Sequence, residues 1–429
     1  MKLLLILAAG AAAMLPLGAR AQTLDEPAQR QLVGRLDQVL KDNYVFPDRL
    51  PAILPRLDTQ ISPQPVDAKI LAERLTTALI AATNDLHFAV AVDPAAVAAG
   101  RDAKARGQES SEADQKRERD ANFGFRRAEM LDGGIAYIRS DFFADPQYGA
   151  ETAAGVMRFT APAEALILDM RYNNGGTLEM AQYLMSTLFP AGKEQMFFDY
   201  FYNKDGVRVA RGQWNLATVP GLRRPTMPVV VLTSSTTFSA AEWIAFSLQK
   251  LGRATIIGER TSGAAHPVAR LPIDDRFLVQ LPIGQISDPV SGKDFEGVGV
   301  HPDIDVASPD ALLTARSFLL EAMAKDGDAA AAWVLPVVRA ELSGYAPGRK
   351  DLESLVGAYQ GRFIEWRGKH LTYRWRERFT RALTPISDTL FAVEGTDDYR
   401  FRFVRAGRRV VAIEMVSQDG AVKRYDRLD

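Results

Sequence analysis

The stretch that decides the fold runs from residue 228 to residue 242 and reads Pro-Val-Val-Val-Leu-Thr-Ser-Ser-Thr-Thr-Phe-Ser-Ala-Ala-Glu. Residues 228–233 are apolar on both faces of an extended chain, apart from the final Thr, which is typical of a strand buried in a parallel sheet. The residues from Ala240 onward indicate a helix. We therefore expect Ser239 at the point where a buried strand turns into a helix.

Ser239 has two interpretations at this junction. A nucleophile there would lie at a helix N-terminus, where unpaired N–H groups and the helix dipole favour developing negative charge. Ser is also a preferred N-cap, and Glu242, three residues on, completes the pattern of a capping box. Taken alone, the local sequence favours the cap.

Strands and helices alternate on both sides of this stretch. Further strands are indicated at residues 134–138, 165–170 and 254–258, and helices at residues 150–159, 178–188 and 240–251. Buried apolar strands separated by helices predict an α/β core with parallel pairing, which we assign to residues 126–310.

Periodicity divides the rest of the chain. Residues 22–95 place apolar side chains at helical spacing and predict an N-terminal helical bundle. Residues 96–125 are strongly charged and predict a solvated loop or surface helix, with a mobile flap as the alternative. Residues 311–350 predict a helical linker. Short strand-like segments with turn pairs predict a small C-terminal antiparallel β domain over residues 351–429.

The first 21 residues have the three parts of a secretory signal peptide. Lys2 gives a positive start, residues 3–17 form an apolar run, and Ala19-Arg20-Ala21 is a small-x-small cleavage pattern. We expect cleavage after Ala21, a secreted or periplasmic protein, and no integral membrane segment after removal of the signal. The alternative is an uncleaved membrane anchor, which the short and interrupted apolar run disfavours.

Composition excludes several classes of function. The chain has no cysteine, so thiol nucleophiles and cysteine metal sites are excluded. The formal net charge is -1, and loss of the positive charges of Lys2 and Arg20 with the signal lowers it to -3, which gives no support to nucleic-acid binding. No zinc-peptidase pattern, acidic ligand cluster, dinucleotide loop or Walker A loop is present, so we expect no metal and no cofactor. Oligomerisation is left open.

Three further elements have residue types suited to catalysis. Gly175 and Gly176 follow a buried strand, where paired glycines suit either an oxyanion hole or a tight turn. A general base for serine is usually histidine, and the chain has four: His87, His266, His301 and His370. Glu296 would orient such a base or lie on a surface loop. Spacing along the chain does not choose among the histidines.

Taken in chain order, these elements resemble the C-terminal processing (tail-specific) peptidases over residues 43–305. The series is Asp85-x-His87, Asp169-x-Arg171-x-Asn173-x-Gly175-Gly176, Thr237-Phe238-Ser239-Ala240-Ala241-Glu242, Gly258-Glu259-x-Thr261-x-Gly263 and Glu296-Gly297-x-Gly299-Val300-x-Pro302-Asp303. The resemblance implies a ClpP/crotonase-like α/β core with Ser239 as nucleophile. It also implies an oxyanion hole made by the backbone N–H of Ala240 with that of Gly176 or Gly175.

The family has two catalytic arrangements. One branch uses a Ser–Lys dyad, but the matching segment here has Ala264 at the lysine position. The other branch is similar to the tricorn core and the interphotoreceptor retinoid-binding-protein-like peptidases and uses a His and a Glu, which His87 and Glu296 match. In tricorn a Ser precedes the His, whereas this chain has Leu86. No segment between residues 84 and 133 resembles a PDZ domain.

The resemblance implies a serine peptidase that acts on a peptide or protein substrate through an acyl-enzyme, and the signal peptide implies that this peptidase is exported. Ser239 would be the nucleophile, His87 the base and Glu296 the support of the charged base. His266 is assigned to substrate binding and is the alternative base. Two other functions stay open: a non-catalytic binding protein for apolar ligands or peptides, and an esterase.

Overall fold

The computed structural model describes residues 23–105, 112–376 and 378–428. The chain divides into two compact units, and each is described by itself. The first unit comprises the described residues up to 114 together with 199–212 and 266–287, and the second comprises 115–198, 213–265 and the residues from 288 onward. The predicted signal peptide, residues 1–21, lies outside the described residues.

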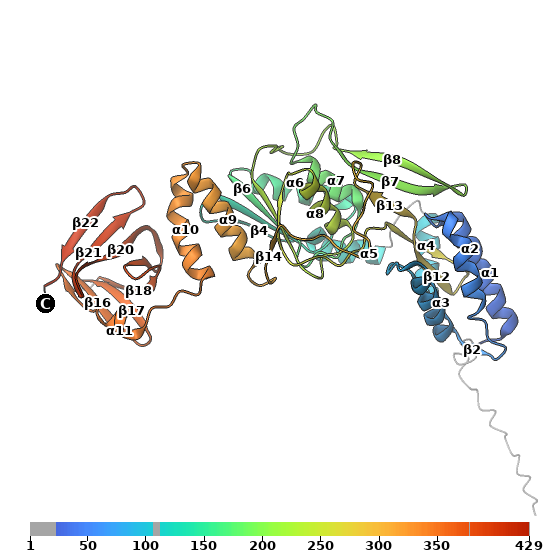
Figure 1. Cartoon of the computed structure of the whole chain (residues 1–429), viewed down its shortest axis with the longest axis horizontal. Coiled ribbons are helices and arrows are strands. Elements are labelled where there is room, and N and C mark those ends of the chain that lie inside the picture. The colour runs from blue at the N-terminus through green and yellow to red at the C-terminus, as the bar shows by residue number, and fades with distance from the viewer. Residues whose placement is uncertain (1–22, 106–111, 377, 429) are drawn as a thin grey trace, which may run out of the picture. The chain divides into compact units, whose positions relative to one another are not determined.

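Helices and a three-stranded sheet build the first unit (Figure 1). Its elements are β1 (Thr23–Leu24), α1 (Glu26–Asn43), the 3₁₀ helix η1 (Pro47–Arg49), α2 (Leu50–Asp58), β2 (Val66–Asp67), α3 (Ala68–Thr83), β3 (Ala89–Val92), α4 (Pro94–Ala105), β11 (Val268–Pro272), β12 (Phe277–Pro282) and β13 (Gly284–Ser287). Strands β7 (Met196–Lys204) and β8 (Val207–Trp214) are divided between the ranges of the two units.

The N-terminal helices share their apolar core with strands from much later in the chain. Leu36 of α1 and Leu75 of α3 lie in one buried cluster with Phe277 and Val279 of β12. The sheet that they cover has the order β11-β12-β3, with both pairs antiparallel. The prediction of an N-terminal helical bundle over residues 22–95 is therefore not confirmed, because strands from later in the chain complete this core.

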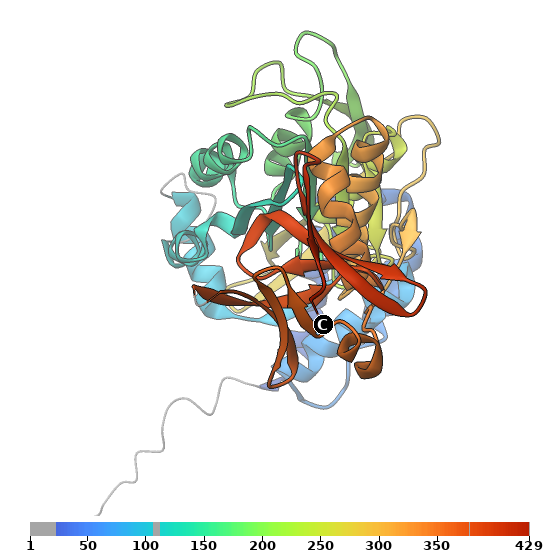
Figure 2. The ribbon, with the colours of Figure 1, turned by 90° about the vertical axis from the view of Figure 1, so that its left-hand side faces the viewer.

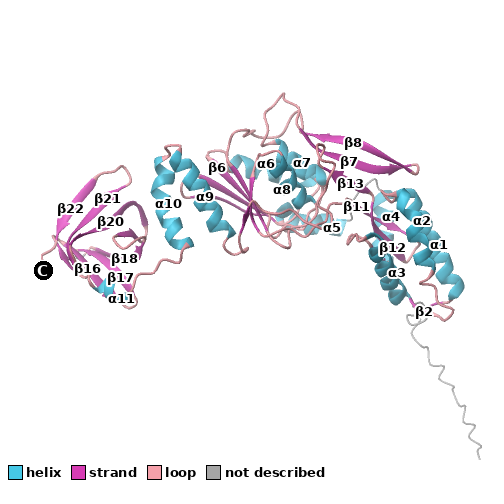
Figure 3. Ribbon diagram, in the orientation of Figure 1, coloured by secondary structure: helices cyan, strands magenta, loops and turns pink. Residues whose placement is uncertain are grey.

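The second unit contains an α/β core followed by two helices and a β domain (Figure 3). Its core elements are α5 (Glu112–Asp120), η2 (Asn122–Gly124), β4 (Phe125–Leu131), β5 (Ile135–Ser140), α6 (Pro146–Phe159), β6 (Ala165–Asp169), α7 (Leu178–Ser186), β9 (Val229–Thr233), α8 (Ala240–Lys250), β10 (Thr255–Gly258) and β14 (Ile304–Asp305). They are followed by α9 (Ala311–Lys325) and α10 (Ala329–Leu342).

The core sheet has the order β14-β10-β9-β6-β5-β4. Its strands are parallel except β4, which pairs antiparallel with β5. Every residue of β6 and β9 is buried, because helices must cover both faces of a parallel sheet. Ile167 and Val230 pack against Ala315 and Leu319 of α9 on one face. The predicted mixed α/β fold with parallel pairing is confirmed.

The C-terminal part is an eight-stranded antiparallel sheet, which faces the viewer in Figure 2. Its elements are α11 (Arg349–Glu353), β15 (Gly357–Tyr359), β16 (Arg362–Arg367), β17 (His370–Trp375), β18 (Phe379–Pro385), β19 (Leu390–Val393), β20 (Thr396–Ala406), β21 (Arg409–Ser417) and β22 (Val422–Asp426). A bridge between Tyr359 and Arg427 joins the first strand to the end of the last, around a core that includes Phe401 and Ile413. The predicted C-terminal antiparallel β domain is confirmed.

Two other predictions concern the charged segment 96–125 and the chain as a whole. The described part of the charged segment 96–125 is largely helical, in α4 and α5, while residues 106–111 lie outside the described residues. Within the residues that the structure describes, no helix combines the length and the apolarity needed to cross a membrane.

A buried ion pair fixes the backbone where β6 ends. Arg171 donates from Nε and Nη2 to the two carboxylate oxygens of Asp169, at 2.9 and 2.7 Å. Tyr137 Oη donates to the same carboxylate at 2.6 Å, and Arg171 Nη1 donates to the Ser308 carbonyl. The Asp169 side chain is fully buried, so removal of one partner leaves a buried charge without compensation.

We expect Arg171→Met to lower the free energy of unfolding by about 3 kcal/mol or more, because it leaves the Asp169 carboxylate buried and unpaired. The matched control is Arg139→Met, which breaks the half-exposed Arg139–Asp141 pair and should cost about 1 kcal/mol or less. Urea denaturation of both variants measures the difference. Equal losses in the two variants would contradict a special role for the buried pair.

Candidate active site

Ser239 occupies the turn between β9 and α8 with a backbone conformation that side chains rarely adopt. Its φ and ψ are 55° and -124°, and it is the residue immediately before Ala240, the first residue of α8. A positive φ is uncommon for a residue other than glycine and costs about 1–3 kcal/mol, so the surroundings must hold the turn in place. The junction predicted between a buried strand and a helix is confirmed.

A glycine loop after β6 packs directly against this turn. The Phe238 N–H donates to the Asn173 carbonyl at 3.0 Å. A Cβ atom built on Gly175 would lie 2.7 Å from Ser239 Cβ and 3.1 Å from the Ala240 nitrogen, at a φ of 93°. Only glycine fits there, because the two backbones approach each other too closely for a side chain.

Two backbone N–H groups beside Ser239 have no hydrogen-bond acceptor among the described residues: those of Gly176 and Ala240. The Gly175 N–H is already engaged, since it donates to Asn173 Oδ1 at 2.8 Å. The Phe143 N–H donates to the Gly175 carbonyl, and the Thr177 N–H donates to the Phe143 carbonyl. The N–H of Gly176 takes part in neither of these two bonds. Of the two glycines predicted for an oxyanion hole, Gly176 is therefore the one with a donor to offer.

Glu242 ties the serine turn to the segment that follows β10. Its carboxylate is fully buried and accepts hydrogen bonds from the backbone of Ser239, Gly263 and Ala264 at 2.8, 2.6 and 2.9 Å. A fourth bond comes from Thr261 Oγ1 at 2.5 Å. Burial raises the pKa of Glu242, and the four hydrogen bonds oppose that rise. The residue therefore closes its half of the capping box and also organises the neighbouring loop.

The structure places Ala264 and Glu296 in this same loop region. Ala264, which stands where the Ser–Lys branch has its lysine, is buried and donates its N–H to Glu242. Glu296 Oε2 accepts from the Ala265 N–H at 2.7 Å. Glu296 therefore holds the backbone one residue before His266.

In the first unit, Asp85 joins His87 and His266. Asp85 Oδ1 is 3.0 Å from His87 Nδ1, and Asp85 Oδ2 forms a short contact with His266 Nδ1. All three side chains are buried. The His87 N–H also donates to Asp85 Oδ1, and Gln280 Nε2 donates to the His87 carbonyl, so the His87 backbone is fixed as well.

The Asp85 carboxylate is held in its charged form. Burial raises its pKa, but the hydrogen bonds from His266 and His87 outweigh burial and leave the pKa well below its usual range. A charged carboxylate only accepts hydrogen bonds, so both rings must present Nδ1–H to it. In each neutral ring the lone pair then lies on Nε2, which is the tautomer that a general base needs.

The ligand atoms of these three residues also lie close enough together to hold a metal ion. Asp85, His87 and His266 each offer one ligand atom within 4.8 Å of the others. The direct contacts of both Nδ1 atoms with Asp85 are those of a hydrogen-bonded cluster. The absence of a metal stays a prediction.

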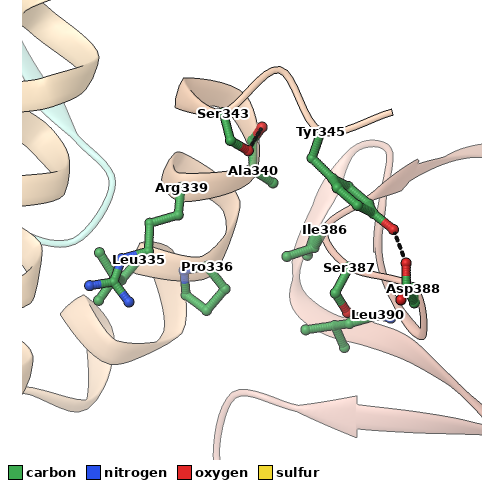
Figure 4. A pocket seen from close by; sticks show the side chains of 10 residues that line it. All are labelled: Leu335, Pro336, Arg339, Ala340, Ser343, Tyr345, Ile386, Ser387, Asp388 and Leu390. Atoms are coloured by element: carbon green, nitrogen blue, oxygen red, sulfur yellow. Dashed lines mark hydrogen bonds between the residues drawn. The ribbon is translucent and has the colours of Figure 1, made fainter. Parts of the chain in front are cut away.

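A cavity of about 500 Å³ lies between α10 and the turn that joins β18 to β19 (Figure 4). Leu335 and Ile386 line its apolar part, and two other lining residues are joined by a hydrogen bond, from Tyr345 Oη to Asp388 Oδ1 at 2.5 Å. None of the predicted site residues lines this cavity.

Comparison with known proteins identifies the domain that contains Ser239. The model of peptidase family S41 matches residues 134–306. This domain belongs to peptidase family S41. The resemblance that the series of motifs predicted is thereby confirmed, and the S41 domain includes the serine turn, the glycine loop and Glu296.

Curated relatives agree with this family. The chain is 27% identical over 188 residues to the carboxy-terminal-processing protease of Bartonella bacilliformis, covering 42% of this chain and 40% of that protein. It is 28% identical over 183 residues to the carboxy-terminal processing protease CtpA of Bacillus subtilis, covering 43% and 37%. The match therefore spans about two fifths of the length of these relatives.

Among solved structures, the photosystem II D1 C-terminal processing protease aligns with a TM-score of 0.44 and 14% identity, covering 66% of this chain and 94% of that one.

Two residues beside the predicted site had no predicted chemical role: Asp85 and Glu242. The signal for Asp85 is its place two residues before His87, and the signal for Glu242 is the capping-box spacing after Ser239. Neither spacing connects Asp85 to His266, which is 181 residues away, or Glu242 to Gly263.

We expect Gly175→Ala to lower the rate of labelling of the S41 domain by a fluorophosphonate about 10²-fold, because the new Cβ displaces the Ser239 turn. Gly192→Ala is the matched control: Gly192 also has a positive φ, of 72°, but nothing lies within 4 Å of its added Cβ. Labelling rates are compared at equal concentrations of folded protein. Equal rates for the two variants would contradict the close packing described above.

We expect Asp85→Asn to flatten the acid limb of the stability profile. The pKa of Asp85 is depressed in the folded protein from its ordinary value of 3.8, so its contribution is present above pH 3.8 and is lost as the pH falls toward the folded pKa. Wild-type protein should thus lose stability below about pH 4 more steeply than the variant does. Urea midpoints measured from pH 6 to pH 2.5 test this, and parallel profiles would contradict it.

Proposed function

We propose that this protein is an exported serine peptidase that hydrolyses peptide bonds through an acyl-enzyme on Ser239. The observation that carries the proposal is the turn at Ser239, where a positive φ, the glycine loop and two unused N–H groups converge. The S41 family of residues 134–306 supports peptides as the substrate class. We also infer a ClpP/crotonase-like relationship for the core over residues 126–310.

His87 is proposed as the general base. Its Nδ1–H donates to Asp85, so the lone pair on Nε2 is left to take the proton from Ser239 Oγ. Asp85 stabilises the imidazolium that results, because the attraction between the ring and the carboxylate grows when the ring becomes charged. Asp85 is therefore a positioning residue, which acts on the reaction through His87.

The proposed reaction is acyl transfer in two stages. Ser239 Oγ attacks the substrate carbonyl carbon, and the oxyanion that forms accepts hydrogen bonds from the N–H groups of Gly176 and Ala240. His87 then gives its proton to the leaving amine as the C–N bond breaks. Water, deprotonated by His87, attacks the acyl-enzyme, and Ser239 recovers its proton when the product acid leaves.

Glu296 is proposed to support the histidines indirectly. Its carboxylate binds the Ala265 N–H, and Ala265 precedes His266, which shares Asp85 with His87. His266 then serves substrate binding, or the base role if His87 does not. A secreted or periplasmic location follows from the predicted signal peptide at residues 1–21 and belongs to the same proposal.

The test is fluorophosphonate labelling of wild type beside Ser239→Ala, His87→Ala and His266→Ala. We expect labelling to fall about 10³-fold or more in the first two variants, because nucleophile and base act as one unit. His370→Ala, at the exposed first residue of β17, is the control and should label like wild type. EDTA should leave the wild-type rate unchanged.

The other outcomes discriminate between the alternatives. Loss of labelling in His266→Ala but not in His87→Ala would transfer the base role to His266. A folded wild-type protein that is not labelled would overturn the peptidase proposal and favour a binding protein. Turnover of ester substrates without turnover of peptides would favour an esterase.

A further inference from the structure

The sheet of β11, β12 and β3 has two edges. At the β3 edge, Thr76 of α3 accepts from the Val90 N–H at 2.8 Å, so a side chain already engages one of the outward backbone groups of β3. Strand β11 forms the opposite edge in the order β11-β12-β3. An open edge is a ready template for another extended chain.

The register of β11 on β12 shows which of its backbone groups point outward. The Ile273 N–H donates to the Phe277 carbonyl at 2.8 Å, and the Ile283 N–H donates to the Pro267 carbonyl at 2.9 Å. Hydrogen-bonded pairs alternate in an antiparallel ladder, so Ala269 and Leu271 bond inward to β12. Val268, Arg270 and Pro272 therefore direct their backbone groups away from the sheet.

Val268 and Arg270 each offer an N–H and a carbonyl at this edge. No described residue hydrogen-bonds these four groups. The two residues are about 6.6 Å apart along the strand, which is the repeat of alternate residues in any extended peptide. Pro272 has no N–H and ends the outward ladder after these two residues.

The position of the edge indicates what it binds. Val268 begins β11 two residues after His266, a member of the buried cluster with Asp85 and His87. A chain lying along β11 is thereby led to that cluster. Val268 is 37% exposed and offers apolar contact, while Arg270 Nε donates to Gln280 Oε1 and keeps that side chain along the sheet.

We propose that the peptide substrate binds by strand addition to β11, through the backbone N–H and carbonyl groups of Val268 and Arg270. The inference rests on the proposed peptidase function and specifies how that function recognises its substrate. Main-chain pairing gives affinity without demanding a particular sequence, so the ligand is an extended, unstructured peptide segment with free backbone N–H groups.

The protein-side test is Arg270→Pro, which removes an outward N–H while the inward bonds of Ala269 and Leu271 are kept. Loss of one hydrogen bond should raise KM for an unstructured peptide about three- to tenfold. Arg270→Ala loses the side chain but keeps both backbone groups, so its KM should be at least threefold below that of Arg270→Pro. Pro272→Ala adds an outward N–H and should lower KM for longer peptides.

The ligand-side test leaves the protein unchanged. A fluorogenic peptide is N-methylated at one residue at a time and offered to wild type. Strand addition predicts that methylation raises KM at every second residue and has little effect between them, because alternate N–H groups face β11. Uniform tolerance of methylation, or equal KM for Arg270→Pro and Arg270→Ala, would overturn the inference.

Fluorophosphonate labelling separates this inference from the proposed function. The small probe needs no strand pairing, so Arg270→Pro should be labelled at the wild-type rate. If wild type is not labelled, the peptidase proposal fails. If wild type and Arg270→Pro are both labelled and their KM values for peptide are equal, the peptidase proposal stands and strand addition to β11 is wrong.

Discussion

The geometry of the Ser239 turn depends on the buried carboxylate of Glu242. Four donors converge on its two oxygens, and three of them are backbone N–H groups whose positions the chain cannot easily shift. Removing a charge from water is costly unless every lone pair finds a partner, and here each oxygen has two. The cost of burial is thus offset by hydrogen bonds that hold Ser239 and the segment around Gly263 in one arrangement.

As the proposed nucleophile, Ser239 needs an exposed oxygen and a rigid backbone, and the two requirements conflict. The positive φ of Ser239 projects the residue from a sharp turn, but such a conformation persists only where surrounding contacts impose it. Three contacts do so: the Ser239 N–H bonds Glu242, the Phe238 N–H bonds Asn173, and Gly175 packs against Ser239 Cβ. The glycine is required by this close approach as well as by its own φ.

Features formed by residues close together in the chain could be predicted from the sequence, whereas contacts between residues far apart in the chain could not. Buried strands, the strand-to-helix junction at Ser239 and the glycine loop follow from residues that are neighbours in the chain. The assignment of β11 and β12 to the N-terminal unit does not, because nothing in the periodicity of residues 22–95 shows that Leu36 packs on Phe277. The contact between Asp85 and His266 was equally invisible, since pairing over 181 residues is set by the fold.

Because His87 and His266 share Asp85, neither histidine can be considered as the base independently of the other. One carboxylate can stabilise one imidazolium well, whereas two charged rings with centroids 6.3 Å apart would repel each other in a buried site. The two histidines and Asp85 therefore form one hydrogen-bonded cluster, in which both rings depend on a single carboxylate. A variant at either histidine changes the electrostatic environment of the one that is left, and only the double variant removes the cluster as a whole.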